Sequence, residues 1–109
     1  MNVNDTLRLG WYSGSEDFPL RSILRSLLRN TGAHLNPKRV IFFGSSGGGY
    51  AALLYAKSID GAVSLTINPQ TDIRSYYSGH VRDYFSSCFP SIPEAERSNY
   101  TNFCDLAGE

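Results

Sequence analysis

A serine flanked by glycines is the part of this chain whose residue types and spacing best suit chemistry. The segment 44–48 (GSSGG) follows the apolar run 40–43 and precedes a stretch of small and apolar residues, 50–56. A Gly-x-Ser-x-Gly pattern between a buried strand and a helix is typical of a nucleophile elbow, a tight turn that exposes the hydroxyl of the central serine. The pattern makes Ser46 the nucleophile and predicts a strained backbone there. Ser45 occupies the variable position before it.

The neighbouring glycines have separate roles in such a turn. The residues two before and two after the serine must lack bulk, and Gly44 and Gly48 meet that requirement. The backbone N–H of Gly47, with the start of the helix, then points to the place where negative charge develops when a hydroxyl attacks a carbonyl. The segment therefore predicts acyl transfer, with Ser46 as the nucleophile and Gly47 as an oxyanion-hole donor.

The stretch Val40–Leu53 (VIFFGSSGGGYAAL) resembles the nucleophile region of the α/β-hydrolase superfamily. The segment Thr66–Asp72 (TINPQTD) is similar to bacterial members linked to surface-polysaccharide biosynthesis and accessory secretion. The resemblance extends from about residue 7 to residue 72. It implies a serine hydrolase or acyltransferase that acts on a small-molecule or glycan ester, with serine, acid and histidine in that chain order.

Two residues after the elbow are candidates for the acid and the base. Asp72 lies just after the strand that follows the nucleophile helix, where some hydrolases place the acid. The acid more often comes one strand later, so a turn or helix-start aspartate is the favoured interpretation of Asp72. His80 keeps the chain order but comes only eight residues later, whereas the superfamily's histidine follows the last strand. His34 precedes the elbow and is expected on a surface loop. We therefore expect the base to lie outside this chain.

Apolar residues at helical spacing predict a helix that starts near Pro19, which suits a first turn. Residues 30–32 are expected to end it, with Gly32 as a left-handed cap. The apolar stripe consists of Leu20, Ile23, Leu24, Leu27 and Leu28. The residues expected on a solvated face are Arg21, Arg25 and Arg29.

The remaining pattern predicts a β-α-β unit around the elbow. Strands are expected at 7–12, 40–43 and 62–67, and helices at 47–57 and 79–88. Residues 40–43 are apolar at every position, as in a parallel strand covered by helices on both faces. The strand–helix–strand order predicts a parallel crossover. Trp11 and Tyr12 are expected in the core rather than in a substrate cleft.

The length of 109 residues allows one domain. A complete α/β-hydrolase sheet needs about eight strands and roughly 200 residues or more. The expected fold class is therefore α/β, a partial and truncated parallel sheet with flanking helices. Residues 1–109 are expected to form one partial domain, with its core in 1–72 and a lid or cap in 73–109. Exposed sheet edges favour a homo-oligomer or contact with the missing remainder of the domain.

Composition removes several classes of partner. Ten basic and ten acidic residues cancel, so nucleic acid and anionic membranes are not expected partners. Residues 1–14 lack the features of a secretory signal, and the longest apolar run, 50–56, is far short of the about 20 residues that span a bilayer. A cytoplasmic location is expected, with Cys88 and Cys104 as thiols rather than a disulfide. No zinc spacing or Walker-type phosphate loop occurs, and no metal or cofactor is expected.

Two alternatives to the enzyme interpretation stay open. The short length and the lack of a well-placed histidine favour a non-catalytic fragment or partner-binding domain that retains the elbow architecture. Segment Gly47–Ala52 is also a degenerate Gly-x-Gly-x-x-Ala dinucleotide fingerprint, with Asp72 as its acidic residue. That pattern begins three residues after Gly44, whereas dinucleotide-binding glycines begin the turn as the strand ends.

Overall fold

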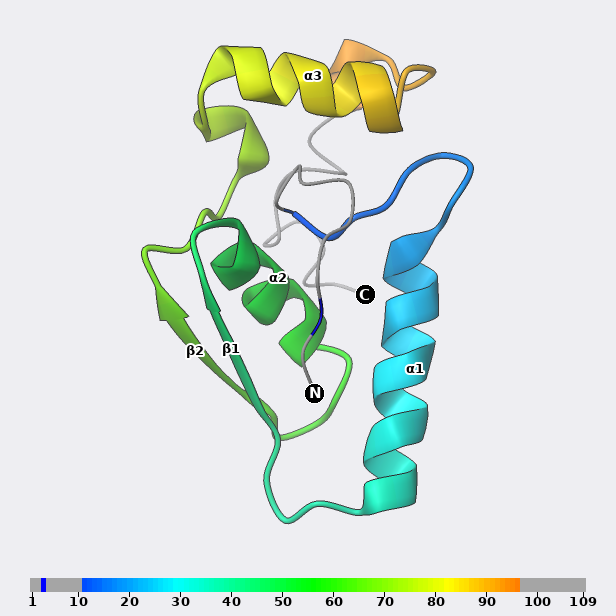
Figure 1. Cartoon of the computed structure of the whole chain (residues 1–109), viewed down its shortest axis with the longest axis vertical. Helices are drawn as coiled ribbons and strands as arrows, with labels where there is room; N and C mark the ends of the chain where they lie inside the picture. The colour runs from blue at the N-terminus through cyan, green and yellow to red at the C-terminus, as the bar shows by residue number, and fades with distance from the viewer. Residues whose placement is uncertain (1–2, 4–10, 97–109) are drawn as a thin grey trace.

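A two-stranded parallel sheet and one connecting helix form the centre of the fold. The computed structural model describes residue 3 and residues 11–96. Within them, β1 (Ile41–Ser45) pairs in parallel with β2 (Val63–Ile67), from Ile41 opposite Val63 to Ser45 opposite Ile67. The helix α2 (Gly47–Ala56) connects the two strands. The predicted β-α-β unit is confirmed, and this part of the chain is a small α/β fold (Figure 1).

The first helix is longer than its sequence signals predict. α1 spans Leu20–Leu35 and begins directly after Pro19. Asn36 takes the left-handed conformation, with φ 44° and ψ 56°, and its N–H donates to the carbonyl of Gly32. The predicted end at 30–32 is therefore wrong. Asn36 precedes a proline, which disfavours a helical conformation at that position, and asparagine tolerates left-handed geometry.

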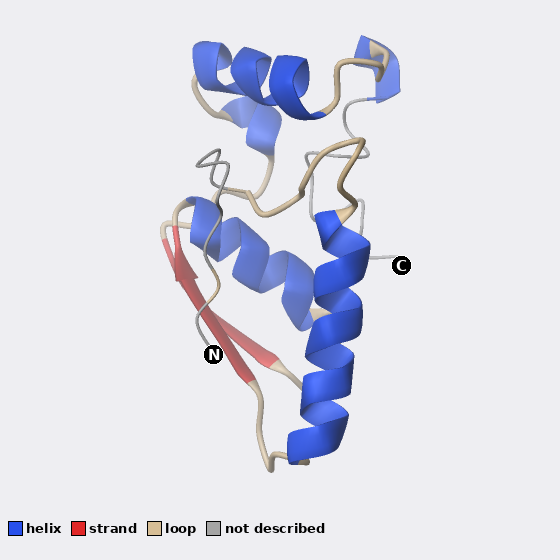
Figure 2. Cartoon of the chain, turned by 45° about the vertical axis from the view of Figure 1, so that its right-hand side comes forward, coloured by secondary structure: helices blue, strands red, loops and turns tan. Residues whose placement is uncertain are grey.

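The helices α1 and α2 lie on the same side of the sheet. Figures 1 and 2 show α2 between the strands and α1. Ser64 of β2 points toward α2, because its hydroxyl donates to the carbonyl of Ala52 at 2.9 Å. The opposite face is apolar and exposed, with Phe43 66% and Leu65 58% accessible. We name it the open sheet face, and its members are Ile41, Phe43, Val63, Leu65 and Ile67. Helical cover on both faces, expected from the sequence, is thus absent within residues 11–96.

The hydrophobic core lies between the sheet unit and the segment after β2. That segment contains the short 3-10 helix η1 (Ile73–Ser75) and the helix α3 (Ser78–Cys88), which confirms the helix predicted at 79–88. Both strands run toward the same end of the sheet, and α3 lies past that end (Figure 1). The largest fully buried side chains are Tyr50, Leu54, Ile73, Tyr84 and Phe85. Part of the expected lid segment therefore lies at the elbow end of the sheet.

The N-terminal predictions have a mixed outcome. Most of the strand expected at 7–12, namely residues 7–10, lies outside the described part of the chain. Trp11 and Tyr12 belong to no strand, and Tyr12 has φ 57°. Trp11 is 3% exposed and belongs to the core, as expected. Cys88, expected to be a thiol, is buried, and the second cysteine, Cys104, lies outside the described residues.

The arginines of α1 do not form the solvated row expected from the sequence. Arg21 and Arg25 are half-buried, and Arg29 donates through Nε to the carbonyl of Ser58 at 3.0 Å. Arginine stems pack along apolar surface while their charged heads contact water or hydrogen-bond acceptors.

Among the described helices, none combines the length and apolarity that a membrane crossing requires.

Tyr50 of α2 makes the stability of the core sensitive to alkaline pH. Its side chain is fully buried, and its hydroxyl has no hydrogen-bond partner within the described residues. Burial raises the pKa of Tyr50 from 10.0 to about 12, and the nearby Arg21 charge offsets part of that shift. The folded state thus favours the neutral phenol. The resulting stabilisation is complete below pH 10 and is lost as the pH rises toward 12.

We predict that Tyr50→Phe changes the free energy of unfolding by less than about 1 kcal/mol at neutral pH, because it removes a buried hydroxyl that has no hydrogen-bond partner among residues 11–96. At a pH of about 11 the variant should be the more stable by about 1 kcal/mol. Urea unfolding followed by circular dichroism measures both values. Tyr77→Phe, at an exposed tyrosine, is the matched control and should leave the pH dependence unchanged. Parallel alkaline profiles for wild type and Tyr50→Phe would contradict the assignment.

Candidate active site

Ser46 occupies a strained turn between β1 and α2. Its φ is 52° and its ψ is −120°, values that L-residues rarely adopt, and the residue is exposed. Its N–H donates to the carbonyl of Ile67 at 3.0 Å, and its carbonyl accepts from the N–H groups of Tyr50 at 3.2 Å and Gln70 at 3.3 Å. These bonds tie the turn to β2 and to the segment that follows β2. The strained and exposed backbone predicted for Ser46 is therefore present.

Gly44 is sterically required for this turn. A Cβ atom at Gly44 would lie 2.1 Å from the carbonyl oxygen and 2.4 Å from the carbonyl carbon of Gly48. At Gly48 an added Cβ would meet no described atom within 4 Å, so the prediction that Gly48 must lack bulk is wrong. The residue that must lack a side chain is instead Gly49, one position later, because a Cβ at Gly49 would lie 2.9 Å from the Cβ of Pro69. The first turn of α2 presents Gly49, not Gly48, to the segment after β2.

The start of α2 supplies donors beside Ser46. Gly47, Gly48 and Gly49 are the first three residues of the helix. The first N–H groups of a helix have no partner inside the helix, and the helix dipole adds positive potential there. Gly47 directly follows Ser46, so its N–H lies where the sequence places an oxyanion donor. The geometry suits stabilisation of negative charge next to the serine hydroxyl.

Gln70 is the side chain that contacts the serine hydroxyl. Its Nε2 donates to Ser46 Oγ at 3.1 Å, and its Oε1 accepts from the indole N–H of Trp11 at 2.5 Å. Reasoning from the sequence did not select Gln70, because a polar residue after a strand has many uses. The available signal was its position just past β2, since neighbouring parallel strands end at the same edge of a sheet.

Asp72 has the helix-start role that was the alternative to a triad acid. Its Oδ1 accepts from the N–H of Arg74 at 3.0 Å and so caps η1. Its Oδ2 lies 3.2 Å from Nη2 of Arg74 in an ion pair. Within the described residues, the hydroxyl of Ser46 makes no hydrogen bond to Asp72. In the structure, the side chain of Gln70 is therefore hydrogen-bonded to Ser46, and the side chain of Asp72 is paired with Arg74.

Neither histidine makes a hydrogen bond to Ser46. His80 is exposed on α3, with its ring 5.6 Å from that of Tyr76 and 6.3 Å from that of Tyr77. His34 lies in the last turn of α1 rather than on a loop, so its expected loop position is wrong. That end of α1 lies at the opposite end of the molecule from the elbow (Figure 1). Of the two, His80 alone shares the elbow end with Ser46.

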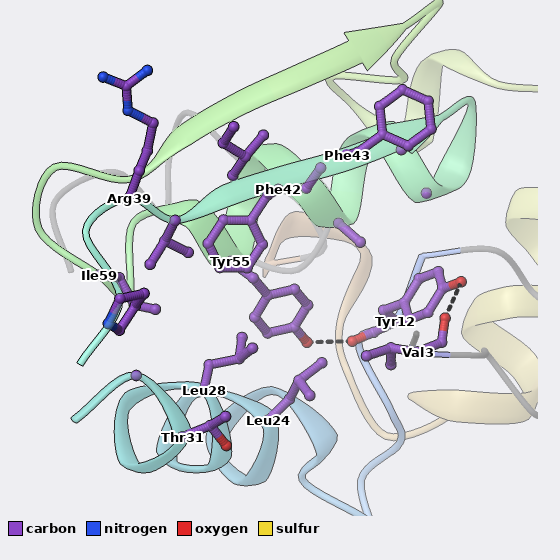
Figure 3. A pocket seen from close by; sticks show the side chains of 18 of the residues that line it. Val3, Tyr12, Leu24, Leu28, Thr31, Arg39, Phe42, Phe43, Tyr55 and Ile59 are labelled. Atoms are coloured by element: carbon purple, nitrogen blue, oxygen red, sulfur yellow. Dashed lines mark hydrogen bonds between the residues drawn. The ribbon is translucent and has the colours of Figure 1, made fainter. Parts of the chain in front are cut away.

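A cavity of about 750 Å³ lies between α1 and the β1–α2 unit (Figure 3). Apolar side chains from three elements line it, among them Leu24, Leu28 and Phe42, and Tyr55 donates to the carbonyl of Tyr12 at its wall. Its lining reaches three neighbours of the nucleophile, namely Gly44, Ser45 and Gly48. A volume of this size suits a small-molecule ligand. No group of three or more metal-ligating side chains occurs in the part of the chain that the structure describes.

Comparison of the chain with protein-family models, curated proteins and solved structures gives no match. The structure itself is a small α/β fold with a strained serine at a strand-to-helix turn.

We predict that alanine affects the stability of the fold differently at the two glycines of the Gly-x-Ser-x-Gly pattern. Gly44→Ala should destabilise the fold by about 2 kcal/mol or more, because its methyl group overlaps the backbone of Gly48. Gly48→Ala should change stability by less than about 0.5 kcal/mol, since open space surrounds that position. Urea unfolding of both variants at neutral pH measures the difference. Equal losses at the two positions would show that the close contact of Gly44 does not control the turn.

Proposed function

We propose that this chain carries the nucleophile segment of a serine hydrolase or acyltransferase of the α/β-hydrolase type. The observation that carries the proposal is the backbone of Ser46, with φ 52° and ψ −120° at an exposed turn. Strain of this kind persists only where the surrounding structure holds it, and it concentrates at functional sites. The donors at the start of α2 give the same turn a means of stabilising an oxyanion.

In the proposed reaction, Ser46 Oγ attacks the carbonyl carbon of an ester. The new C–O bond forms as the hydroxyl proton passes to a base, and the carbonyl oxygen becomes an oxyanion that accepts from the N–H of Gly47. Collapse of this intermediate expels the alcohol, which takes the proton, and leaves an acyl-serine. Water or an acceptor hydroxyl then releases the acyl group. These steps need no metal or cofactor.

The base in this proposal comes from outside the chain. The sequence has two histidines. His34 lies at the far end of the molecule, and the ring of His80 packs against those of Tyr76 and Tyr77. Asp72 is held by Arg74. We therefore assign the histidine to polypeptide that completes the site, and we take a small-molecule or glycan ester in the cytoplasm as the substrate.

A second candidate function is partner binding, and the open sheet face favours it. Parallel sheets are normally covered on both faces, and a two-stranded sheet with one face in water is rarely stable alone. All five side chains of this face are apolar and more than half exposed. Because the face carries no charge, a second copy of it can pack there without repulsion. We propose that another copy of the chain, or the remainder of a larger domain, covers it.

We predict that a fluorophosphonate probe, applied with the polypeptide that supplies the base present, labels the wild-type protein and Ser45→Ala but not Ser46→Ala. The phosphorus atom of the probe captures a nucleophilic serine hydroxyl, and Ser45 is the neighbouring serine that lacks the elbow position. In-gel fluorescence and mass spectrometry of the labelled peptide identify the site. Equal labelling of wild type and Ser46→Ala would remove the assignment. Absence of labelling in the wild type would favour the partner-binding alternative.

We predict that the wild-type protein forms dimers or larger species and that the double variant Phe43→Ser, Leu65→Ser is monomeric. Each buried apolar side chain contributes about 1.5–3 kcal/mol, so the dissociation constant should rise by about 100-fold or more. Size-exclusion chromatography with light scattering over a concentration series measures it. Leu27→Ser, at a half-exposed leucine of α1, is the control and should leave association unchanged. A wild-type monomer at every concentration would contradict self-association.

A further inference from the structure

The side-chain amide of Gln70 has a single orientation fixed by its two partners. The indole N–H of Trp11 can only donate, so the Gln70 atom that faces it must be the oxygen. The nitrogen Nε2 must then face Ser46, and it lies 3.1 Å from Oγ. The bond to Trp11, at 2.5 Å, therefore settles which end of the amide meets the hydroxyl.

Trp11 is itself held firmly. It is 3% exposed, and its ring makes edge-to-face contacts with Tyr84 of α3 at 5.1 Å and with Tyr76 at 5.8 Å. Such aromatic pairs stabilise a fixed ring orientation. The backbone of Gln70 is also fixed, because its N–H donates to the carbonyl of Ser46. Gln70 is thus preorganised from both ends before any ligand binds.

A preorganised amide N–H at this position suits one role in acyl transfer. An uncharged amide cannot take the proton of Ser46, so Gln70 is not the base. Its Nε2 carries two hydrogens, and one bond to Oγ leaves the other hydrogen for a further acceptor. When Oγ bonds to a carbonyl carbon, the developing oxyanion lies next to Oγ and so within reach of Nε2. Fixed donors aimed at that charge lower the barrier without reorganising.

We propose that Gln70 is the second oxyanion donor of the site, facing the N–H of Gly47 across the developing charge, with Trp11 as its positioning residue. This inference rests on the proposed function of Ser46. It assigns a catalytic contact to the segment after β2.

The test measures the rate constant of fluorophosphonate labelling with the polypeptide that supplies the base present, because the phosphoryl oxygen of the probe takes the place of the oxyanion. Gln70→Glu keeps an oxygen for the indole of Trp11 but presents an acceptor to Ser46 in place of the donor. Its rate at neutral pH should fall by about 100-fold or more. As the pH drops toward the usual glutamate pKa of about 4.3, the protonated side chain donates again, and the ratio of variant to wild-type rate should rise. A structural defect would not produce that pH dependence.

Three further variants complete the experiment. Gln70→Met, similar in length and uncharged, should lose labelling to the same extent and keeps the test valid if Gln70→Glu does not fold. Trp11→Phe removes the orienting bond and should lower the rate by a smaller factor. Thr71→Ala, at the exposed neighbour, is the control and should match wild type. Circular dichroism of each variant monitors folding.

The outcomes separate the two proposals. If Ser46 labels in the wild type and both Gln70 variants label at the wild-type rate, the role of Gln70 is overturned while that of Ser46 stands. A faster rate in Gln70→Glu would show a carboxylate acting as a base and would also overturn the donor role. Absence of labelling at Ser46 in the wild type would remove both proposals.

Discussion

The close approach of β1 to the first turn of α2 is the constraint on which the candidate site depends. Gly44 has no side chain, and the strand there comes so near to Gly48 that a Cβ would lie 2.1 Å from its carbonyl oxygen. The chain must reverse direction within one residue, and Ser46 takes a positive φ. A conformation of this kind costs on the order of 1–3 kcal/mol. Backbone hydrogen bonds to Ile67 and Gln70 offset that cost and hold the hydroxyl exposed.

The segment after β2 connects the elbow to the aromatic core. Pro69 packs against Gly49, and Gln70 joins Ser46 to the buried indole of Trp11. Trp11 in turn contacts a tyrosine of α3, Tyr84. A change in the packing of α3 would therefore reach the serine hydroxyl through two side chains. The region that sequence patterns treat as a lid or cap is in this way part of the support of the site.

The two faces of the sheet differ in how much of their apolar surface is covered. On one face α2 packs closely, and Ser64 bonds to its backbone. The open sheet face has the composition of a core and the exposure of a surface, as Phe43 shows at 66%. The partner-binding proposal rests on this mismatch.

The sequence by itself determined the local structure around the serine. The apolar run before it, the glycines and the small residues after it were enough to predict β1, the turn and α2, because these depend on backbone sterics and hydrophobic period. Tertiary contacts decided the rest. They shifted the steric requirement from Gly48 to Gly49 and placed Gln70 against Ser46. Each of these features depends on a residue that is distant in the chain but close in space, and residue types and spacing do not reveal which distant residues are close in space.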